Sequence, residues 1–235
     1  MIAMLAAAAV FAAPAGFEAV QQLDLTAALR TRTPWTMTLL QPTGANAEIG
    51  KAAKVCLTGG PETATRCDDL VADGYAFQTI RGAAVEPLSA KAALKGVSVK
   101  AEFSGGGRVL RRTDVWTYRA ASDDFERTSG FSRSGLGDEE RFASGALDGL
   151  YIVADVLMGA GETRWSGHRY SVEIYKLDPR FGGYVQVFQY LSPSAYPSER
   201  RGPHEVIDGE LPRARKLLAA AYPNGLAQLG AAPAH

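Results

Sequence analysis

The stretch GVSVKAEFSGGG, residues 96–107, alternates apolar and polar side chains and then runs into three glycines. Alternation with a period of two predicts a β-strand with one buried face, and the glycines predict a turn. A second stretch, GLYIVADVLMGAG at residues 149–161, aligns with it without a gap at an offset of 149 − 96 = 53 residues. Each is followed by a strand-like segment that ends in tyrosine, then a polar turn and an aromatic strand-like segment. We therefore expect a mainly β fold with two quasi-repeats of an antiparallel, three-stranded meander.

The two predicted copies differ in the polarity of their strands. Every second residue of the first stretch is polar, so one of its faces should be wet, whereas Tyr151 and Val153 make both faces of the second apolar. The second copy is therefore the expected centre of the sheet. The pattern leaves three arrangements of the strands open: a sandwich, a barrel and a propeller-like sheet. The alternative to a repeat is that the two stretches are unrelated meanders, since all meanders share alternation and turn chemistry.

Helices are expected at both ends of the β-rich region. Residues 17–34 place apolar side chains at roughly helical intervals before Pro34, which predicts a short N-terminal helix. Near the C-terminus, Asp208 is a suitable helix cap, Pro212 suits a first turn, and Pro223 should end the helix. The apolar stripe of this second helix should pack against the sheet.

The first residues, MIAMLAAAAVFAAPA, form a small and apolar run that ends in the alternating small residues a signal peptidase requires. We expect residues 1–15 to be a signal peptide, although no Lys or Arg precedes the run, and the alternative is a buried N-terminal helix. Residues 16–225 are then a single β-rich domain and residues 226–235 a loose tail. No segment reaches the roughly 20 apolar residues that span a bilayer, so we expect no transmembrane segment and a periplasmic or secreted location.

The two cysteines, Cys56 and Cys67, lie in strand-like pieces on either side of a Gly-Gly-Pro turn. Their spacing of 67 − 56 = 11 residues lets them face each other across a hairpin, and in an oxidising compartment they should form a disulfide. The alternative is half of a zinc site, which lacks both the usual close pairing of cysteines and a nearby histidine.

Charge and motifs disfavour several classes of function. Lys and Arg together number 25, as do Asp and Glu, and the two signs are mixed along the chain, so nucleic acid is not an expected partner. The glycine-rich stretches match no phosphate-binding motif, and Asp123 with Asp124 suits a hairpin turn better than a calcium loop. We therefore expect neither a cofactor nor a metal.

Catalytic candidates are few. The run Asp138–Arg141 is expected to be a loop between the two copies, where Glu139 and Glu140 could serve a hydrolase acting on an envelope polymer. The alternatives for this run are a solvated loop and an Arg–carboxylate pair that braces the junction of the copies. Among the three histidines, His168 and His204 are the remaining catalytic candidates. They are weak candidates, because the sequence contains no zinc-hydrolase or nucleophile-elbow motif.

The long connection before the C-terminal helix is the expected partner surface, since loops of this length within a compact domain are often functional. It contains residue types enriched at interfaces, and the binding candidates are Tyr190, Tyr196, Arg200, Arg201 and His204. The alternative is a loop packed against the domain by Tyr196 and Ile207.

The succession DVWTYRAASDDFERT, EERFASGALDGLYIVAD, YSVEIYKL, GYVQVFQYLSPSAYPSE and VIDGELP, about a third of the chain, resembles a family of exported, β-rich bacterial proteins with no assigned activity. The resemblance implies an envelope location and assigns no functional residue.

Our leading hypothesis is an exported binding or interaction module that acts through loops around residues 133–141 and 192–207. Its partner would be an unknown protein or envelope component. The alternatives are the hydrolase and a structural envelope component without a site.

Overall fold

The structure, a computed structural model, describes residues 12–60, 64–158, 162–163, 165–197 and 204–223. It confirms the mainly β fold. The strands are β1 (Phe17–Asp24), β2 (Trp35–Pro42), β3 (Lys54–Gly59), β4 (Ala64–Asp69), β5 (Val71–Ala72), β6 (Tyr75–Ala76), β7 (Thr79–Ser89), β8 (Leu94–Gly105), β9 (Arg108–Arg119), β10 (Asp124–Ser134), β11 (Asp138–Phe142), β12 (Leu150–Leu157), β13 (Arg169–Asp178) and β14 (Gly183–Leu191). The helices are α1 (Thr26–Leu29), α2 (Ala45–Glu48) and α3 (Glu205–Ala221), with a 3₁₀ turn η1 (Gly145–Leu147).

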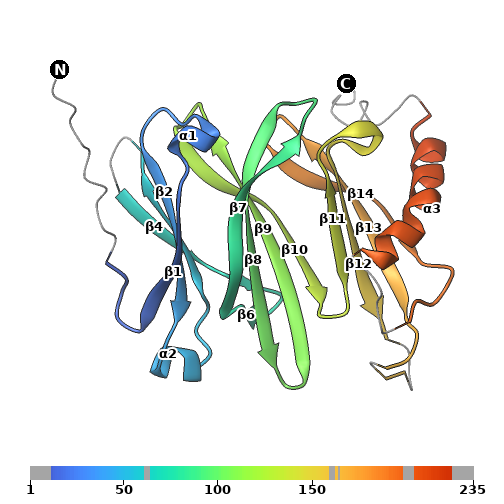
Figure 1. Ribbon diagram of the computed structural model, residues 1–235, viewed down its shortest axis with the longest axis horizontal. Helices are drawn as coiled ribbons and strands as arrows, with labels where there is room; N and C mark the ends of the chain where they lie inside the picture. The colour runs from blue at the N-terminus through green and yellow to red at the C-terminus, as the bar shows by residue number, and fades with distance from the viewer. Residues whose placement is uncertain (1–11, 61–63, 159–161, 164, 198–203, 224–235) are drawn as a thin grey trace.

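Three four-stranded antiparallel sheets follow one another along the chain. Sheet I is β1-β2-β3-β4, sheet II is β7-β8-β9-β10 and sheet III is β11-β12-β13-β14, while β5 and β6 form a separate small hairpin. Each sheet is a meander whose strands pair in chain order. The sheets lie side by side in the order I, II, III, and α3 covers the outer face of sheet III (Figure 1). The arrangement is therefore a sandwich-like stack.

Apolar clusters fill the spaces between these layers. In β8, Val97 and Val99 face sheet I, where they join the largest core cluster. In β12, alternate residues separate to the two faces, because Ile152 packs with α3 while Tyr151 and Val153 pack with sheet II. Sheet III is thus covered on both faces.

The structure corrects two expectations about the sheets. Sheet II, which contains the first predicted copy, lies between the other two, so the second copy is not the centre. The face of sheet II that was expected to be wet is also partly covered, because sheet III packs on it and leaves Ser98 only 2% exposed. The aligned strands β8 and β12 do occupy equivalent places, since each is the second strand of its meander. An internal repeat in the sense of common origin stays a hypothesis.

The prediction for the N-terminal helix is wrong for most of its length. Residues 17–24 form β1, which pairs with β2, and only the four residues of α1 are helical. The alternation of Gln22, Leu23 and Asp24 suits a strand, and the pairing with β2 outweighs the weak helical spacing.

The C-terminal helix forms, but its start was misplaced. It begins at Glu205 with His204 as the N-cap residue, so Asp208 lies in its first turn and Pro212 lies inside the helix. The predicted end is confirmed, because α3 stops at Ala221, before Pro223.

The predicted disulfide is confirmed. Cys56 in β3 and Cys67 in β4 lie directly opposite each other and are joined. Within the described residues, no helix has the length and apolar character needed to cross a membrane. The apolar part of the predicted leader, residues 1–11, and the predicted tail lie outside the described residues.

Candidate functional site at the seam between sheets II and III

Residues 138–140, predicted to be a loop, are part of strand β11, and the strand decides in which direction each of their carboxylates points. Glu139 pairs with Val153 on β12 and faces sheet II, whereas Glu140 pairs with Ile152 and faces α3. Adjacent residues of a strand point to opposite faces. The two carboxylates therefore do not share a site, and they are not placed to act on one glycosidic bond.

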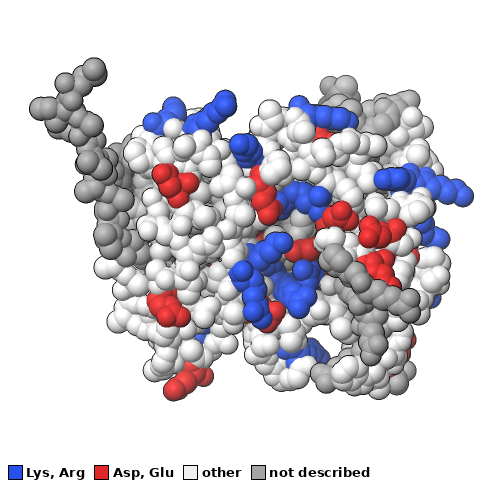
Figure 2. All heavy atoms as spheres, in the orientation of Figure 1, with Lys and Arg blue, Asp and Glu red and all other residues white. Residues whose placement is uncertain are grey.

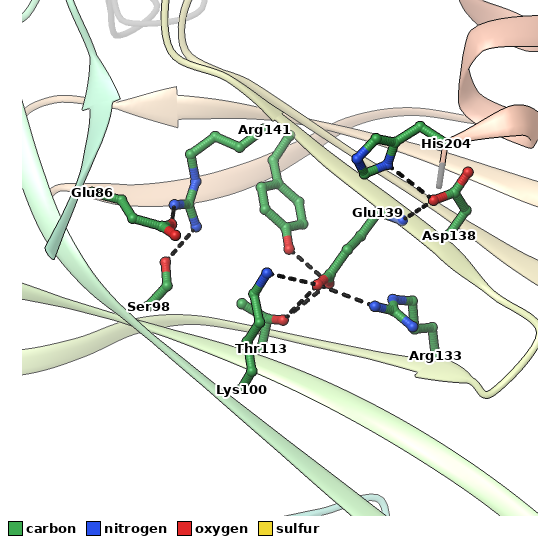
Figure 3. A network of polar contacts seen from close by, with 10 residues as sticks. Glu86, Ser98, Lys100, Thr113, Arg133, Asp138, Glu139, Arg141 and His204 are labelled. Atoms are coloured by element: carbon green, nitrogen blue, oxygen red, sulfur yellow. Dashed lines mark hydrogen bonds and ion pairs between the residues drawn. The ribbon is translucent and has the colours of Figure 1, made fainter. Parts of the chain in front are cut away.

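Glu139 is buried in the seam, where several donors meet its carboxylate (Figure 3). The Thr113 hydroxyl donates to it at 2.9 Å and the Tyr151 hydroxyl at 2.7 Å, while Nη2 of Arg133 lies 3.2 Å away. Burial alone would raise the pKa of Glu139, but the charge of Arg133 and the hydrogen bonds from Tyr151, Arg133 and Thr113 outweigh it and lower the pKa. Glu139 is therefore ionised at neutral pH and acts as a brace between the sheets.

Two further contacts hold the same seam together. Arg141, the next seam-facing residue of β11, forms an ion pair with Glu86, donates to the Ser98 hydroxyl at 2.7 Å, and lies over the Tyr151 ring at 5.3 Å. Asp148 accepts a hydrogen bond from the Ser89 hydroxyl at 2.6 Å, and the amides of residues 90 and 91 also donate to it. The arrangement is the Arg–carboxylate brace that we held as one alternative for this run.

The opposite face of β11 brings together the two loops of the binding hypothesis. Nδ1 of His204 lies 3.2 Å from Oδ1 of Asp138 (Figure 3). The Ile207 amide donates to Oδ2 of the same carboxylate at 3.4 Å. Burial raises the pKa of Glu140; His204 opposes this rise, and the carboxylates of Asp208 and Asp138 reinforce it. Across the part of the chain that the structure describes, no three or more His, Cys, Asp or Glu side chains are grouped to hold a metal ion.

Of the remaining predicted residues, Tyr190 and Tyr196 pack against the apolar cluster between sheet III and α3. The Tyr196 hydroxyl donates to Oε1 of Glu210 at 2.8 Å, and the backbone of Tyr196 exchanges two hydrogen bonds with that of His168. His168 is fully buried and its Nδ1 lies 3.2 Å from Glu162. The Tyr190 hydroxyl also points to the backbone of Glu210, at 3.5 Å. These side chains pack the connection against α3, while Arg200 and Arg201 lie outside the described residues.

A cationic surface next to the seam was not predicted from the sequence. We call it the cationic ledge, and it consists of Arg81, Lys100, Arg111 and Arg133. Arg111 lies directly opposite Arg133 across β9 and β10, and Lys100 lies one pair further along the same face. Figure 2 shows Lys and Arg side chains gathered in the middle of this face of the molecule, with carboxylates beside them.

The cationic ledge has more positive than negative charge. Its carboxylates are Glu102, which pairs with Arg81 at 2.5 Å and Arg111 at 3.4 Å, and Glu139. Four cations and two carboxylates leave 4 − 2 = 2 positive charges. Glu102 has a lowered pKa, mainly through its hydrogen bond with Arg81, so both carboxylates are ionised at neutral pH and the excess persists.

The cationic ledge also has unused donors and a built-in repulsion. Nε and Nη1 of Arg133 are buried and find no hydrogen-bond acceptor among the described residues. Like charges directly opposite each other in an antiparallel pair repel, so Arg111 and Arg133 repel each other across β9 and β10, and their pairing with Glu102 and Glu139 offsets part of this repulsion. The cationic ledge could not be predicted from the order of residues along the chain, because its four members come from four different strands. The polar alternation in residues 96–107 was the available signal.

Comparison with protein-family models, with curated proteins and with solved structures found no match to this chain.

Proposed function

We propose that the protein is an exported binding module that recognises an oxyanion group on an envelope component, such as a phosphate, through the cationic ledge. The observation that carries the proposal is the direct opposition of Arg111 and Arg133 in a patch with excess positive charge. The repulsion within this pair would be relieved by a bound anion. Guanidinium groups suit this task, because their donors form a planar fork that matches phosphate and carboxylate oxygens.

The exposure of the cationic ledge supports a binding role. The side chains of Arg81, Lys100 and Arg111 are 57%, 55% and 46% exposed, so a ligand can reach them without opening the seam. Arg133 lies deeper and is held by the brace carboxylate, which gives the ledge a fixed base. The whole chain has no net charge, so binding should depend on this local patch and weaken with added salt.

The location in the proposal rests on two features. The apolar leader predicts export, and the Cys56–Cys67 disulfide fits an oxidising compartment. The intact mass of the protein isolated from its native source tests this part. Loss of the first 15 residues is expected, and a retained Met1 would contradict export.

Binding is tested by titrating the purified protein with inorganic pyrophosphate and with vesicles that contain an anionic lipid, at low salt. The double variant Lys100→Gln/Arg111→Gln should bind at least about tenfold more weakly, which corresponds to 1.4 kcal/mol. Arg180→Gln is the matched control, since Arg180 is similarly exposed, at 58%, and is paired with Asp178 in the β13–β14 turn.

Several outcomes of these titrations would support or refute the oxyanion site. Binding of pyrophosphate with the predicted loss in the double variant supports an oxyanion site, and preference for vesicles over pyrophosphate would assign it to a lipid headgroup. No binding of either probe by the folded wild type would refute the proposal and favour the structural role. Equal weakening in Arg180→Gln would also refute it, because the effect would then reflect overall charge.

A further inference from the structure

Strand β4 is an open edge of sheet I. All six of its residues are exposed, and among the described strands it pairs with β3 alone. Cys67 lies opposite Cys56 with a Cα–Cα distance of 4.0 Å, the close approach of a pair whose backbone groups do not bond each other. The N–H and C=O groups of Cys67, and by alternation those of Thr65 and Asp69, therefore point away from the sheet.

These outward groups are available for a new strand. Among the described residues, no backbone hydrogen bond outside the strand ladders uses the amide or carbonyl of Thr65, Cys67 or Asp69. The disulfide fixes the register of β3 and β4, so the edge is ordered in advance of binding. An edge of this kind is the template for β-strand addition by an extended peptide.

A cleft of about 530 Å³ lies beside this edge, between β4 and the β9–β10 hairpin. Its lining includes Arg66, Asp68, Trp116, Arg119, Asp124 and Arg127. Arg66 and Asp68 face it because their partners on β3, Leu57 and Val55, point toward sheet II. An added strand would direct every second side chain into this cleft.

The charges of the cleft differ in how firmly they are held. Arg66 is 2.6 Å from Asp124 and Arg119 is 2.7 Å from Glu126, so these four charges are paired. Arg127, in contrast, has only a loose contact with the buried Asp114, at 3.8 Å.

Two polar groups in the cleft have no partner within the part of the chain that the structure describes. Asp68 takes part in no hydrogen bond or ion pair with another described residue, although it lines the same cleft as the paired arginines Arg66 and Arg119. The indole N–H of Trp116 meets no acceptor in the described ranges of the chain, although the residue is only 1% exposed. Together with Arg127, these groups leave the cleft with one free anion, one loosely held cation and one unused donor.

We propose that β4 and this cleft bind an extended peptide segment as a fifth strand of sheet I, with a basic and an acidic side chain two residues apart. The main chain of the peptide pairs with the outward groups of Thr65, Cys67 and Asp69. The basic side chain meets Asp68, and the acidic one meets Arg127. A second copy of the protein is a poorer fit, because it would offer its own β4, whose Arg66 is already held by Asp124.

The probe is a synthetic peptide, acetyl-TKTETKTE-amide, which alternates threonine with Lys and Glu and so presents both signs on one face. Its binding should shift and protect the amides of Thr65, Cys67 and Asp69 in NMR spectra. Asp68→Lys should weaken binding by about tenfold or more. Thr65→Pro should do the same by removing one outward donor, while leaving the pairing with β3 intact.

Two controls separate this site from other effects. Glu18→Lys places the same change of charge on β1, at the opposite edge of sheet I, and should leave peptide binding unchanged. Arg111→Gln in the cationic ledge should also leave it unchanged, so failure of the proposed oxyanion site and failure of the peptide site are distinguishable.

The following results would overturn the peptide site. A peptide with N-methyl groups on alternate amides that binds as well as the parent would exclude strand addition. Shifts confined to residues away from β4 would place the peptide elsewhere. Self-association through β4 without peptide, seen by sedimentation and abolished by Thr65→Pro, would assign the edge to a second copy instead.

Discussion

The two faces of sheet II differ in how they bind their neighbours. The face toward sheet I is mainly apolar, and residues such as Trp116 and Val97 join one large core cluster there, beside the buried ion pair of Asp114 with Arg112. The face toward sheet III contains a smaller apolar cluster together with the charged braces of Glu139 and Arg141. The same strands supply both faces, because alternate residues point in opposite directions.

The two faces therefore have different roles: the apolar face holds the layers together, and the charged face fixes how they are oriented. Apolar burial stabilises a contact in proportion to area and tolerates small shifts of one layer over the other. A buried ion pair is stabilising only with correct geometry, since its charges lose contact with water. The I–II interface therefore supplies most of the cohesion of sheet II, and the II–III interface fixes the position of sheet III and of the cationic ledge beside it.

The apolar interface should respond most strongly to truncation. Phe77 is 1% exposed and belongs to the core between sheets I and II. Phe77→Ala should lower the free energy of unfolding by about 3 to 5 kcal/mol, through lost burial and a residual cavity. The loss, measured by urea denaturation, should be nearly independent of pH. Phe181→Ala, at a position that is 38% exposed, is the control and should cost much less.

The charged interface should give a slightly smaller effect that depends on pH. Glu139→Gln should lower the free energy of unfolding at pH 7 by about 3 kcal/mol, since it leaves Arg133 without its buried partner. The pKa of Glu139 is lowered by folding, so its stabilisation is present above the usual value of 4.5 and is lost as pH falls through the folded value.

The difference between wild type and Glu139→Gln should therefore shrink in acid. Denaturation curves at several pH values measure it, with Glu126→Gln as the control because that side chain is 61% exposed. A difference that stays constant from neutral pH to pH below 4.5 would show that Glu139 is not an ionised brace.

Removal of the Cys56–Cys67 disulfide tests how much this bond adds to the stability that sheet I gains from its apolar face. Cys56→Ala/Cys67→Ala should lower the free energy of unfolding by about 2 to 3 kcal/mol, because the closed loop of 11 residues restricts the unfolded chain. Reduction of the wild type should produce a similar loss, measured by thermal denaturation. A change in the pH dependence at Glu139 would contradict the separation of the two interfaces.

The cationic ledge should show the smallest change in stability. Arg111→Gln removes a loose contact with Glu102 and relieves the repulsion by Arg133, so the free energy of unfolding should change by less than about 0.5 kcal/mol. Binding of pyrophosphate should nevertheless fall. A large destabilisation would mean that Arg111 is part of the brace and not of a binding surface.

The sequence predicted much of the fold and little of the candidate site. Alternation in residues 96–107 and the spacing of the cysteines led to the mainly β fold and the disulfide, and Pro223 marked the end of α3. The N-terminal prediction was wrong because residues 17–24 were judged by local periodicity, whereas their pairing with β2 decides their conformation. Glu139 and Glu140 were identified as important, but their opposite directions follow only from the strand that contains them.

By itself, the sequence determined the strands β8, β9 and β10 and the turns between them, because alternation and turn chemistry act between near neighbours in the chain. It also determined which residues could pair as cystines across one hairpin. The tertiary structure alone decided that Glu139 is a buried brace, that Arg81, Lys100, Arg111 and Arg133 share one surface, and that β4 borders an open cleft. These features depend on the neighbours of each strand and on the sheet that covers each face. Such long-range packing leaves no periodic signal in the sequence.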